Sequence, residues 1–178
     1  MKLIELFNEI EPKSDKFRGH NYEEYYSNEF NSKRKDSLKM LEIGINYGYS
    51  INLWSKFFIN SEIVGVDIKN MYGDLLKDNT NIKLYIENAY SREFSSKFED
   101  GYFDYIIEDG SHSLNHQLEA IKLFYPKLKI GAKMIIEDIQ GVGFADRLVD
   151  YCENNNLQYK FFDLRGREDD LIIEIIKN

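Results

Sequence analysis

Two patterns of apolar and polar residues alternate along this chain, one typical of buried strands and one typical of helices. Short apolar runs end on glycine or a polar residue in LKMLEIG, SEIVGVDI, NIKLYIENA, YFDYIIEDG and AKMIIEDI. Segments with apolar residues at helical spacing follow several of these runs, as in YSINLWSKFF, SLNHQLEAIKLFYPKL and FADRLVDYCENN. Strands that alternate with helices indicate a parallel sheet with helices on both faces.

The two ends of the chain depart from this alternation. LIELFNEI predicts a short N-terminal helix, and the aromatic, polar segment after it predicts a loop followed by a helix from about Tyr22. MYGDLLKD, after the second strand, predicts a short helix or a turn. LQYKFFDL and LIIEIIKN flank the polar turn RGREDD, which is the signal for an antiparallel pair. We therefore expect a doubly wound α/β fold, with a mainly parallel seven-stranded sheet and a C-terminal antiparallel hairpin.

Composition narrows the class of protein. The 178 residues fit one domain, and a hydrophobic content of 43% is enough for a core. A net charge of −8 argues against a nucleic-acid partner, which needs a concentrated basic surface. The first residues do not resemble a signal peptide, and no apolar run approaches the ~20 residues of a membrane span, so we expect a cytoplasmic protein with no membrane partner. Cys152 is the single cysteine, which excludes an intrachain disulfide and a thiolate metal cluster.

Acidic or amide side chains stand at the end of every predicted parallel strand. These residues are Glu42, Asp67, Asn88, Asp109 and the pair Glu137–Asp138. In an open parallel sheet the carboxyl ends of the strands line the ligand crevice. Each residue taken alone is equally consistent with a helix N-cap. Their joint occurrence favours a shared site.

The segment EIGINYGYS follows the first strand and has the glycines of a nucleotide-binding turn. Gly44 allows a tight turn, and Gly48 lets the next helix begin close to a ligand. Asn46 stands where the dinucleotide pattern G-x-G-x-x-G requires glycine, which weakens an NAD reading. Asp67 lies about 20 residues further on, where an acid that binds ribose hydroxyls is expected with either cofactor.

Four segments occur in an order that resembles a known enzyme family. E-x-G-x-x-x-G-x-S resembles motif I of class I S-adenosylmethionine (SAM) methyltransferases. The order DKFRGHNY, LEIGINYGYSINLW, DGSHSLNHQ, LFYPKLKIGAKMIIEDI resembles the bacterial metal-dependent sugar O-methyltransferases over most of the chain. That group includes the macrolide-sugar enzymes of the mycinamicin and macrocin type and the rhamnosyl O-methyltransferase/cephalosporin hydroxylase group. The segment after EDI is shorter here than in the larger relatives.

The resemblance implies roles for individual residues. Asp109, Glu137 and Asp138 correspond to the ligands of a divalent metal, and His112 to the general base. The residues expected to bind SAM are Lys16, His20, Glu42, Gly44, Tyr47, Ser50, Asp67, Asn88, Ala89 and Asp109. Asp15 and Tyr22 lie in the segment near the cofactor, without a defined role. The whole chain, 1–178, is expected to be one methyltransferase domain, in which 1–37 cover the cofactor site and 38–178 form the Rossmann-like core.

Physical chemistry supports the metal assignment independently. Neighbouring strand ends lie roughly 5 Å apart, so three carboxylates there would repel one another unless a cation neutralised them. Oxygen ligands suit a hard ion such as Mg²⁺ better than zinc. A metal-bound sugar hydroxyl would lose its proton to His112 and attack the sulfonium methyl group.

Several residues have plainer readings. His112 could instead cap the following helix, and His116, one helical turn further on, is expected to pack beside the site. Tyr22, Tyr25, Tyr26 and Trp54 are expected in the core or at the rim of the site, and Glu108 on the other face of the sheet.

The acceptor is the least defined part of the prediction. We expect a nucleotide-linked sugar of surface polysaccharide biosynthesis; a glycosylated natural product or another small hydroxylated acceptor is the alternative. An NAD-type oxidoreductase and a non-catalytic SAM- or nucleotide-binding module are the rival classes. Homo-oligomerisation is left open.

Overall fold

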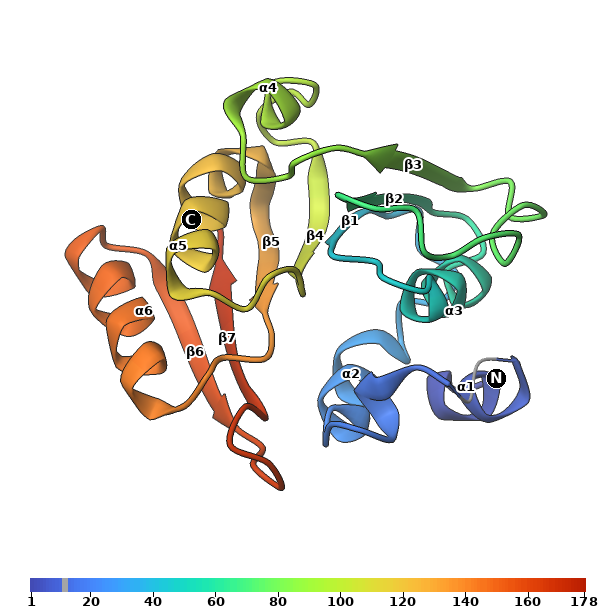
Figure 1. The fold of residues 1–178 in the computed structure, drawn as a ribbon, viewed down its shortest axis with the longest axis horizontal. Coiled ribbons are helices and arrows are strands. Elements are labelled where there is room, and N and C mark those ends of the chain that lie inside the picture. Colours follow the sequence, from blue (N-terminus) through green and yellow to red (C-terminus); the bar gives the residue numbers. More distant parts are fainter. Residues whose placement is uncertain (11–12) are drawn as a thin grey trace.

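A twisted sheet forms the centre of the computed structural model, which describes residues 1–10 and 13–178. In this part of the chain the sheet has seven strands in the order β3-β2-β1-β4-β5-β7-β6 (Figure 1). Their bounds are β1 (Lys39–Ile43), β2 (Glu62–Asp67), β3 (Ile82–Ile86), β4 (Phe103–Glu108), β5 (Leu128–Ile136), β6 (Gln158–Asp163) and β7 (Leu171–Ile176). The first five strands pair in parallel, and β7 pairs antiparallel with β5 and β6. The predicted fold class is confirmed.

Helices cover both faces of the sheet. One side carries α1 (Leu3–Ile10), the 3₁₀ turn η1 (Asp15–Phe17), α2 (Glu23–Phe30) and α3 (Tyr49–Phe57) (Figure 1). The other side carries α4 (Arg92–Ser95), α5 (Leu114–Phe124), the 3₁₀ turn η2 (Tyr125–Lys127) and α6 (Val142–Asn154). Successive residues of a strand pack into the hydrophobic cores on opposite faces of the sheet. Leu41 packs with the α5–α6 layer, and Met40 packs with the α1–α3 layer.

Three local features differ from or complete the sequence-based expectation. MYGDLLKD forms turns, and Leu76 from it packs against the bare backbone of Gly48, where an added Cβ would lie 3.1 Å from the leucine. The four-residue helix α4 was not predicted; Ser91 caps it by accepting the Phe94 N–H. β5 begins at Leu128, four residues before the predicted start at Ala132, because Leu128 pairs with Phe103 ahead of a register shift.

Backbone hydrogen bonds continue past the strand ends and bring the acidic positions together. The Asp109 N–H donates to the Ile43 carbonyl at 2.9 Å, and the Glu137 N–H donates to the Glu108 carbonyl at 3.0 Å. Gly44, with φ +84°, permits this approach, since a Cβ there would lie 2.1 Å from the Asp109 carbonyl oxygen. The tight turn after β1 therefore requires glycine.

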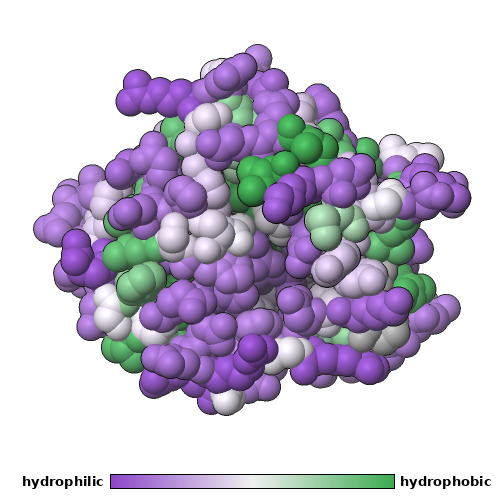
Figure 2. Space-filling model, in the orientation of Figure 1, coloured by the Kyte–Doolittle hydropathy of each residue, from purple (hydrophilic) through white to green (hydrophobic). Residues whose placement is uncertain are grey.

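The surface seen in Figure 2 is mostly hydrophilic, and its apolar residues are scattered in small groups. Among the described residues, no helix is long and apolar enough to cross a membrane.

Candidate active site

A cavity of about 670 Å³ opens at the carboxyl ends of β1, β2 and β4. Five residues predicted to bind the cofactor line it: Gly44, Tyr47, Ser50, Asp67 and Asp109. At the same cavity stand His112 and Asp138, the predicted base and one predicted metal ligand. The nucleotide-binding turn and the acidic cluster therefore border one continuous space.

Asp67 organises the wall of the cavity formed by the glycine turn. Its Oδ2 accepts the backbone N–H groups of Ile45 at 3.1 Å and Asn46 at 2.9 Å, and its Oδ1 accepts that of Lys69 at 3.1 Å. Asn46 has φ +42°, so asparagine holds a left-handed conformation where the dinucleotide pattern would place glycine. The carboxylate at the end of β2 thus fixes the loop after β1.

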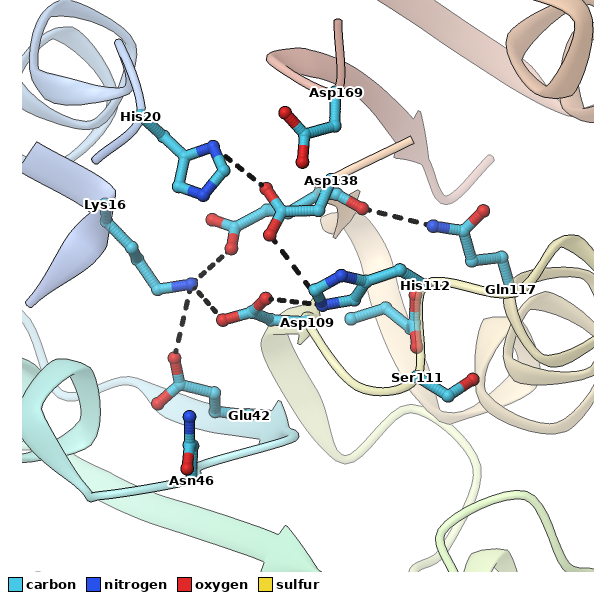
Figure 3. A network of polar contacts seen from close by, with 12 residues as sticks. Lys16, His20, Glu42, Asn46, Asp109, Ser111, His112, Gln117, Asp138 and Asp169 are labelled. Carbon is cyan, nitrogen blue, oxygen red and sulfur yellow. Dashed lines mark hydrogen bonds and ion pairs between the residues drawn. The ribbon is translucent and has the colours of Figure 1, made fainter. Parts of the chain in front are cut away.

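The Asp109 and Asp138 carboxylates face the imidazole of His112 (Figure 3). His112 Nε2 lies 3.3 Å from Asp109 Oδ1 and 3.7 Å from Asp138 Oδ2. Both His112 and Asp138 have positive φ angles, +54° and +50°. Left-handed backbone at residues other than glycine is unfavourable and clusters at functional sites. The three side chains offer atoms within 4.8 Å of one another, close enough to hold one metal ion.

The charges in this cluster shift one another's pKa values. The hydrogen bond to Asp109, together with the charges of Asp109 and Asp138, raises the pKa of His112 to about 9, although burial opposes this change. Burial and the neighbouring Asp109 charge raise the pKa of Asp138. Burial would also raise the pKa of Asp109, but Lys16 and His112 together lower it. The carboxylates around His112 therefore favour its protonated form.

Lys16 lies inside the acidic cluster, whereas the sequence placed it among the cofactor-binding residues. Its Nζ donates to Asp109 Oδ2 at 2.6 Å and to Glu137 Oε2, and lies 3.7 Å from Glu42 Oε1 (Figure 3). The side chain is only 2% exposed. Glu137, the third predicted metal ligand, is therefore bound to an ammonium group, and its other oxygen accepts the hydroxyl of Tyr26.

His20 lies beside Asp138, on the side away from His112. Its Nδ1 lies 2.7 Å from Asp170 Oδ1 and 3.5 Å from Asp138 Oδ1. The Tyr22 hydroxyl donates to Asp138 Oδ1 at 2.6 Å. His20, Asp169 and Asp170 form a second group whose ligand atoms lie within 4.8 Å of one another.

Residues 13–22, which we call the N-terminal strap, are held by the loop between β6 and β7. Arg167 Nη1 donates to the Gly19 carbonyl at 3.1 Å, and Asn21 Nδ2 donates to the Leu164 carbonyl at 3.2 Å. The hydrogen bond between His20 and Asp170 adds a third link. The strap also lines the cavity through Lys13, Ser14 and Asp15, and the Ser14 hydroxyl is buried with no hydrogen-bond partner among the described residues.

Four other residues considered in the sequence analysis lie outside the main cavity and make contacts within the fold. Asn88 is exposed, and its Oδ1 accepts the Tyr90 N–H at 3.0 Å; Ala89 lines a smaller adjoining cavity of about 160 Å³. His116 stacks on Tyr90 with ring centroids 4.2 Å apart. Glu108 accepts the Tyr90 hydroxyl at 2.5 Å, on the α5 side of the sheet.

The sequence did not assign roles to Tyr26, Asp170 or Ser14. Tyr26 was expected in the core or at the rim, and it is fully buried, but the acceptor for its hydroxyl could not be predicted. Asp170 comes from the hairpin, at a sequence separation of 150 from His20. Its position as the last acid of the polar turn RGREDD was the sequence signal available for it.

Comparison with known proteins places this geometry in a family. A family model described as a methyltransferase domain matches residues 41–139. The 8-demethyl-8-alpha-L-rhamnosyl tetracenomycin-C 2'-O-methyltransferase of Streptomyces olivaceus is 28% identical over 164 residues, which cover 77% of this chain and 42% of that protein. The mycinamicin VI 2''-O-methyltransferase of Micromonospora griseorubida is 28% identical over 130 residues, covering 67% of this chain and 32% of that protein. The chain thus spans less than half the length of these relatives.

A solved structure has the same fold. It is the MycE methyltransferase from the mycinamycin biosynthetic pathway in complex with Mg, SAH and mycinamycin VI, with a TM-score of 0.74 and 22% sequence identity. The similarity covers 99% of this chain and 54% of that chain. At this identity the likeness concerns the fold.

Proposed function

This chain belongs to the methyltransferase domain family, and we propose that it transfers a methyl group from SAM to a hydroxyl group of a sugar carried by a small molecule. One observation carries the proposal: a single cavity is bordered by the glycine turn with Asp67 and by Asp109, His112 and Asp138. A methyl donor bound at the first part would present its sulfonium to the second. The names of two relatives, a rhamnosyl tetracenomycin-C 2'-O-methyltransferase and a mycinamicin VI 2''-O-methyltransferase, support the acceptor class.

The cofactor would be held by the strand ends and the strap. Asp67 lines the cavity and would accept hydrogen bonds from ribose hydroxyls, and Gly44 would allow a close approach of the ligand to the backbone. The Ser14 hydroxyl, which has no hydrogen-bond partner among the described residues, adds a hydrogen-bonding group to the lining of the cavity. Asn88 does not line this cavity and accepts the Tyr90 N–H, so we assign it to the turn after β3.

A divalent metal ion fits the donor set of the cluster. Asp109 and Asp138 turn oxygens towards one point beside the cavity, and oxygen donors suit Mg²⁺. Four buried or half-buried carboxylates meet there, those of Glu42, Asp109, Glu137 and Asp138. The Lys16 ammonium and a protonated His112 offer only two positive charges against these four groups. Burial accordingly raises the pKa of Glu42 to about 7 and raises the pKa of Glu137. We propose Asp109 and Asp138 as ligands, with Glu137 joining them when Lys16 releases it.

His112 is the proposed general base. When bound, Mg²⁺ supplies charge that favours ionisation of a coordinated sugar hydroxyl. His112 Nε2 faces the position between Asp109 and Asp138 and would take the hydroxyl proton there. Neutralisation of those two carboxylates removes the charges that hold the pKa of His112 near 9, so that the imidazole can accept a proton near neutral pH. The sugar oxygen then bonds to the methyl carbon as the carbon–sulfur bond breaks.

The acceptor is proposed to be a glycosylated natural product. The relatives reported above act on rhamnosyl tetracenomycin and on mycinamicin, according to their names, and neither name contains a nucleotide-linked sugar. A nucleotide-linked sugar of surface polysaccharide synthesis therefore serves as the second class of acceptor in the test.

The experiment is an acceptor screen with SAM and Mg²⁺, read by mass spectrometry as the gain of one methyl group. A methylated rhamnosyl polyketide supports the proposal. Methylation restricted to nucleotide-linked sugars would contradict the proposed acceptor class and identify nucleotide-linked sugars as the acceptors. SAM binding without transfer to any acceptor would favour the binding-module alternative. Reduction of NAD with no methyl transfer would favour the oxidoreductase.

A further inference from the structure

Lys16 occupies the interior of the proposed metal site. The N-terminal strap carries it into the gap between the ends of β1, β4 and β5, from which Glu42, Asp109 and Glu137 project. Its ammonium is 2.6 Å from Asp109 Oδ2 and in hydrogen-bond contact with Glu137 Oε2. These are two of the three carboxylates proposed to ligate a divalent ion.

The lysine is charged in this position. Its Nζ donates to Asp109 Oδ2 and to Glu137 Oε2, and Glu42 Oε1 lies 3.7 Å away, so three carboxylates surround the ammonium. A buried ammonium that contacts two carboxylates is a cation bound to the same acceptors as a metal ion. The Lys16 ammonium therefore acts as the counter-ion of the carboxylate cluster.

From this geometry we infer that Lys16 is a built-in competitor of the divalent ion for Asp109 and Glu137, and thereby sets the metal affinity of the site. The inference rests on the proposed function, in which these carboxylates hold the ion. Without the ion, Lys16 keeps the strand ends together and limits their repulsion. When the ion binds, it displaces the ammonium from at least one of the two carboxylates.

Glu42 is an alternative acceptor for the displaced ammonium. Its Oε1 lies 3.7 Å from Lys16 Nζ, and its Oε2 is buried with no hydrogen-bond partner among the described residues. A rotation of the four-carbon lysine side chain would bring the ammonium onto Glu42 without moving the strap. The strap itself is anchored by Phe17, whose ring stacks on Phe7 at 4.7 Å. Metal binding would therefore exchange partners within the cluster and leave the backbone in place.

Metal binding by Lys16→Met tests the inference without SAM or acceptor. Mn²⁺ serves as the probe, with affinity measured by titration calorimetry and electron paramagnetic resonance. Removal of the competing charge should tighten Mn²⁺ binding by roughly tenfold or more, because one nearby positive charge no longer opposes the ion. Lys16→Arg retains the charge and should not tighten binding. The double variant Lys16→Met/Glu137→Gln should lose most of the gain, because the carboxylate released by the first change is absent. Equal or weaker binding by a folded Lys16→Met would overturn the inference.

A second measurement uses the unaltered chain, in case Lys16→Met does not fold. The side-chain ¹⁵N resonance of Lys16 is identified by its loss in Lys16→Arg. This resonance should shift when Mg²⁺ is added without Mn²⁺, because the hydrogen-bond partners of the ammonium change. An unchanged resonance at saturating Mg²⁺ would also overturn the inference. Asp138→Asn separates this result from failure of the proposed function. If Asp138→Asn binds Mn²⁺ as well as the unaltered chain does, the metal site itself is misplaced; if it binds weakly while Lys16→Met shows no gain, only the competition fails.

Discussion

His20 and Asp170 share a hydrogen bond of 2.7 Å across a sequence separation of 150. It joins the N-terminal strap to the C-terminal hairpin directly beside Asp138. The other oxygen of Asp170 accepts the backbone N–H groups of Gly166 at 3.0 Å and Arg167 at 2.8 Å. One buried carboxylate thus shapes the hairpin loop and orients a histidine at the site.

Asp170→Asn should loosen the strap. An amide has a single oxygen, so its NH2 group would face either the two backbone N–H groups of the loop or His20 in place of an acceptor. A buried group left unsatisfied in this way costs about 1–3 kcal/mol of unfolding free energy. Because the strap lines the cofactor cavity, we expect the KM for SAM to rise more than kcat falls. Asp169→Asn, at the partly exposed neighbouring position, is the matched control for denaturant unfolding and kinetics. Equal effects of the two variants would contradict the role of Asp170 in holding the N-terminal strap.

His112→Gln should lower kcat and spare SAM binding. Removal of a general base commonly slows a reaction about 10²–10⁴-fold. The control is His116→Gln, because His116 stacks on Tyr90 and hydrogen bonds Ser111 outside the carboxylate cluster. Single-turnover rates together with calorimetric SAM binding separate chemistry from affinity. Full methyl transfer by a folded His112→Gln would remove His112 from the role of base.

Asp67→Ala should weaken SAM binding by roughly tenfold or more, since hydrogen bonds to charged groups contribute about 1.5–3 kcal/mol. The same change releases the loop after β1, whose Ile45 and Asn46 N–H groups bond to this carboxylate. Asn88→Ala is the comparison, because sequence analysis assigned both residues to the cofactor and the structure places only Asp67 at the main cavity. Equal loss of SAM affinity in the two variants would show that the cofactor lies elsewhere.

Glu29 gives a pH-dependent contribution to stability away from the proposed site. Burial would raise its pKa, but hydrogen bonds from Lys133 and Tyr105 lower it overall below 4.5. A carboxylate whose pKa is lowered by folding stabilises the protein above the unfolded-state pKa, and this contribution is lost as pH falls through the folded-state pKa. The stability difference between the unaltered chain and Glu29→Gln should therefore be constant above about pH 4.5 and shrink below it. Thermal unfolding at several pH values measures it, and a difference that grows in acid would contradict the assignment.

The sequence predicted the parts of the molecule that depend on periodicity and topology. Apolar runs of strand length alternating with helices led to the correct sheet, and the rule that ligands bind at carboxyl ends placed Asp67, Asp109 and Asp138 at one cavity. Family resemblance supplied the pairing of Asp109 with His112, which the structure places 3.3 Å apart.

The interior of the cluster could not be predicted in the same way. Neither periodicity nor a motif indicates whether the Lys16 side chain points into the cavity or between strand ends, since this depends on how the strap packs. Tyr26 has the composition of a core residue, and its hydroxyl finds Glu137 only because α2 crosses the end of β5. The Asp170 contact depends on the hairpin folding back over the strap, a long-range relationship that no local pattern encodes.

We propose that this cavity methylates a sugar hydroxyl with His112 as the base and a divalent ion at Asp109 and Asp138. The most direct measurement is mass spectrometry of a rhamnosyl polyketide incubated with the protein, SAM and Mg²⁺. We expect one added methyl group on the sugar, with the signal abolished by a chelator and restored by excess Mg²⁺. Undiminished methylation in the presence of the chelator would contradict the role of the metal, and no methylation of any glycoside by folded, SAM-bound protein would contradict the function itself.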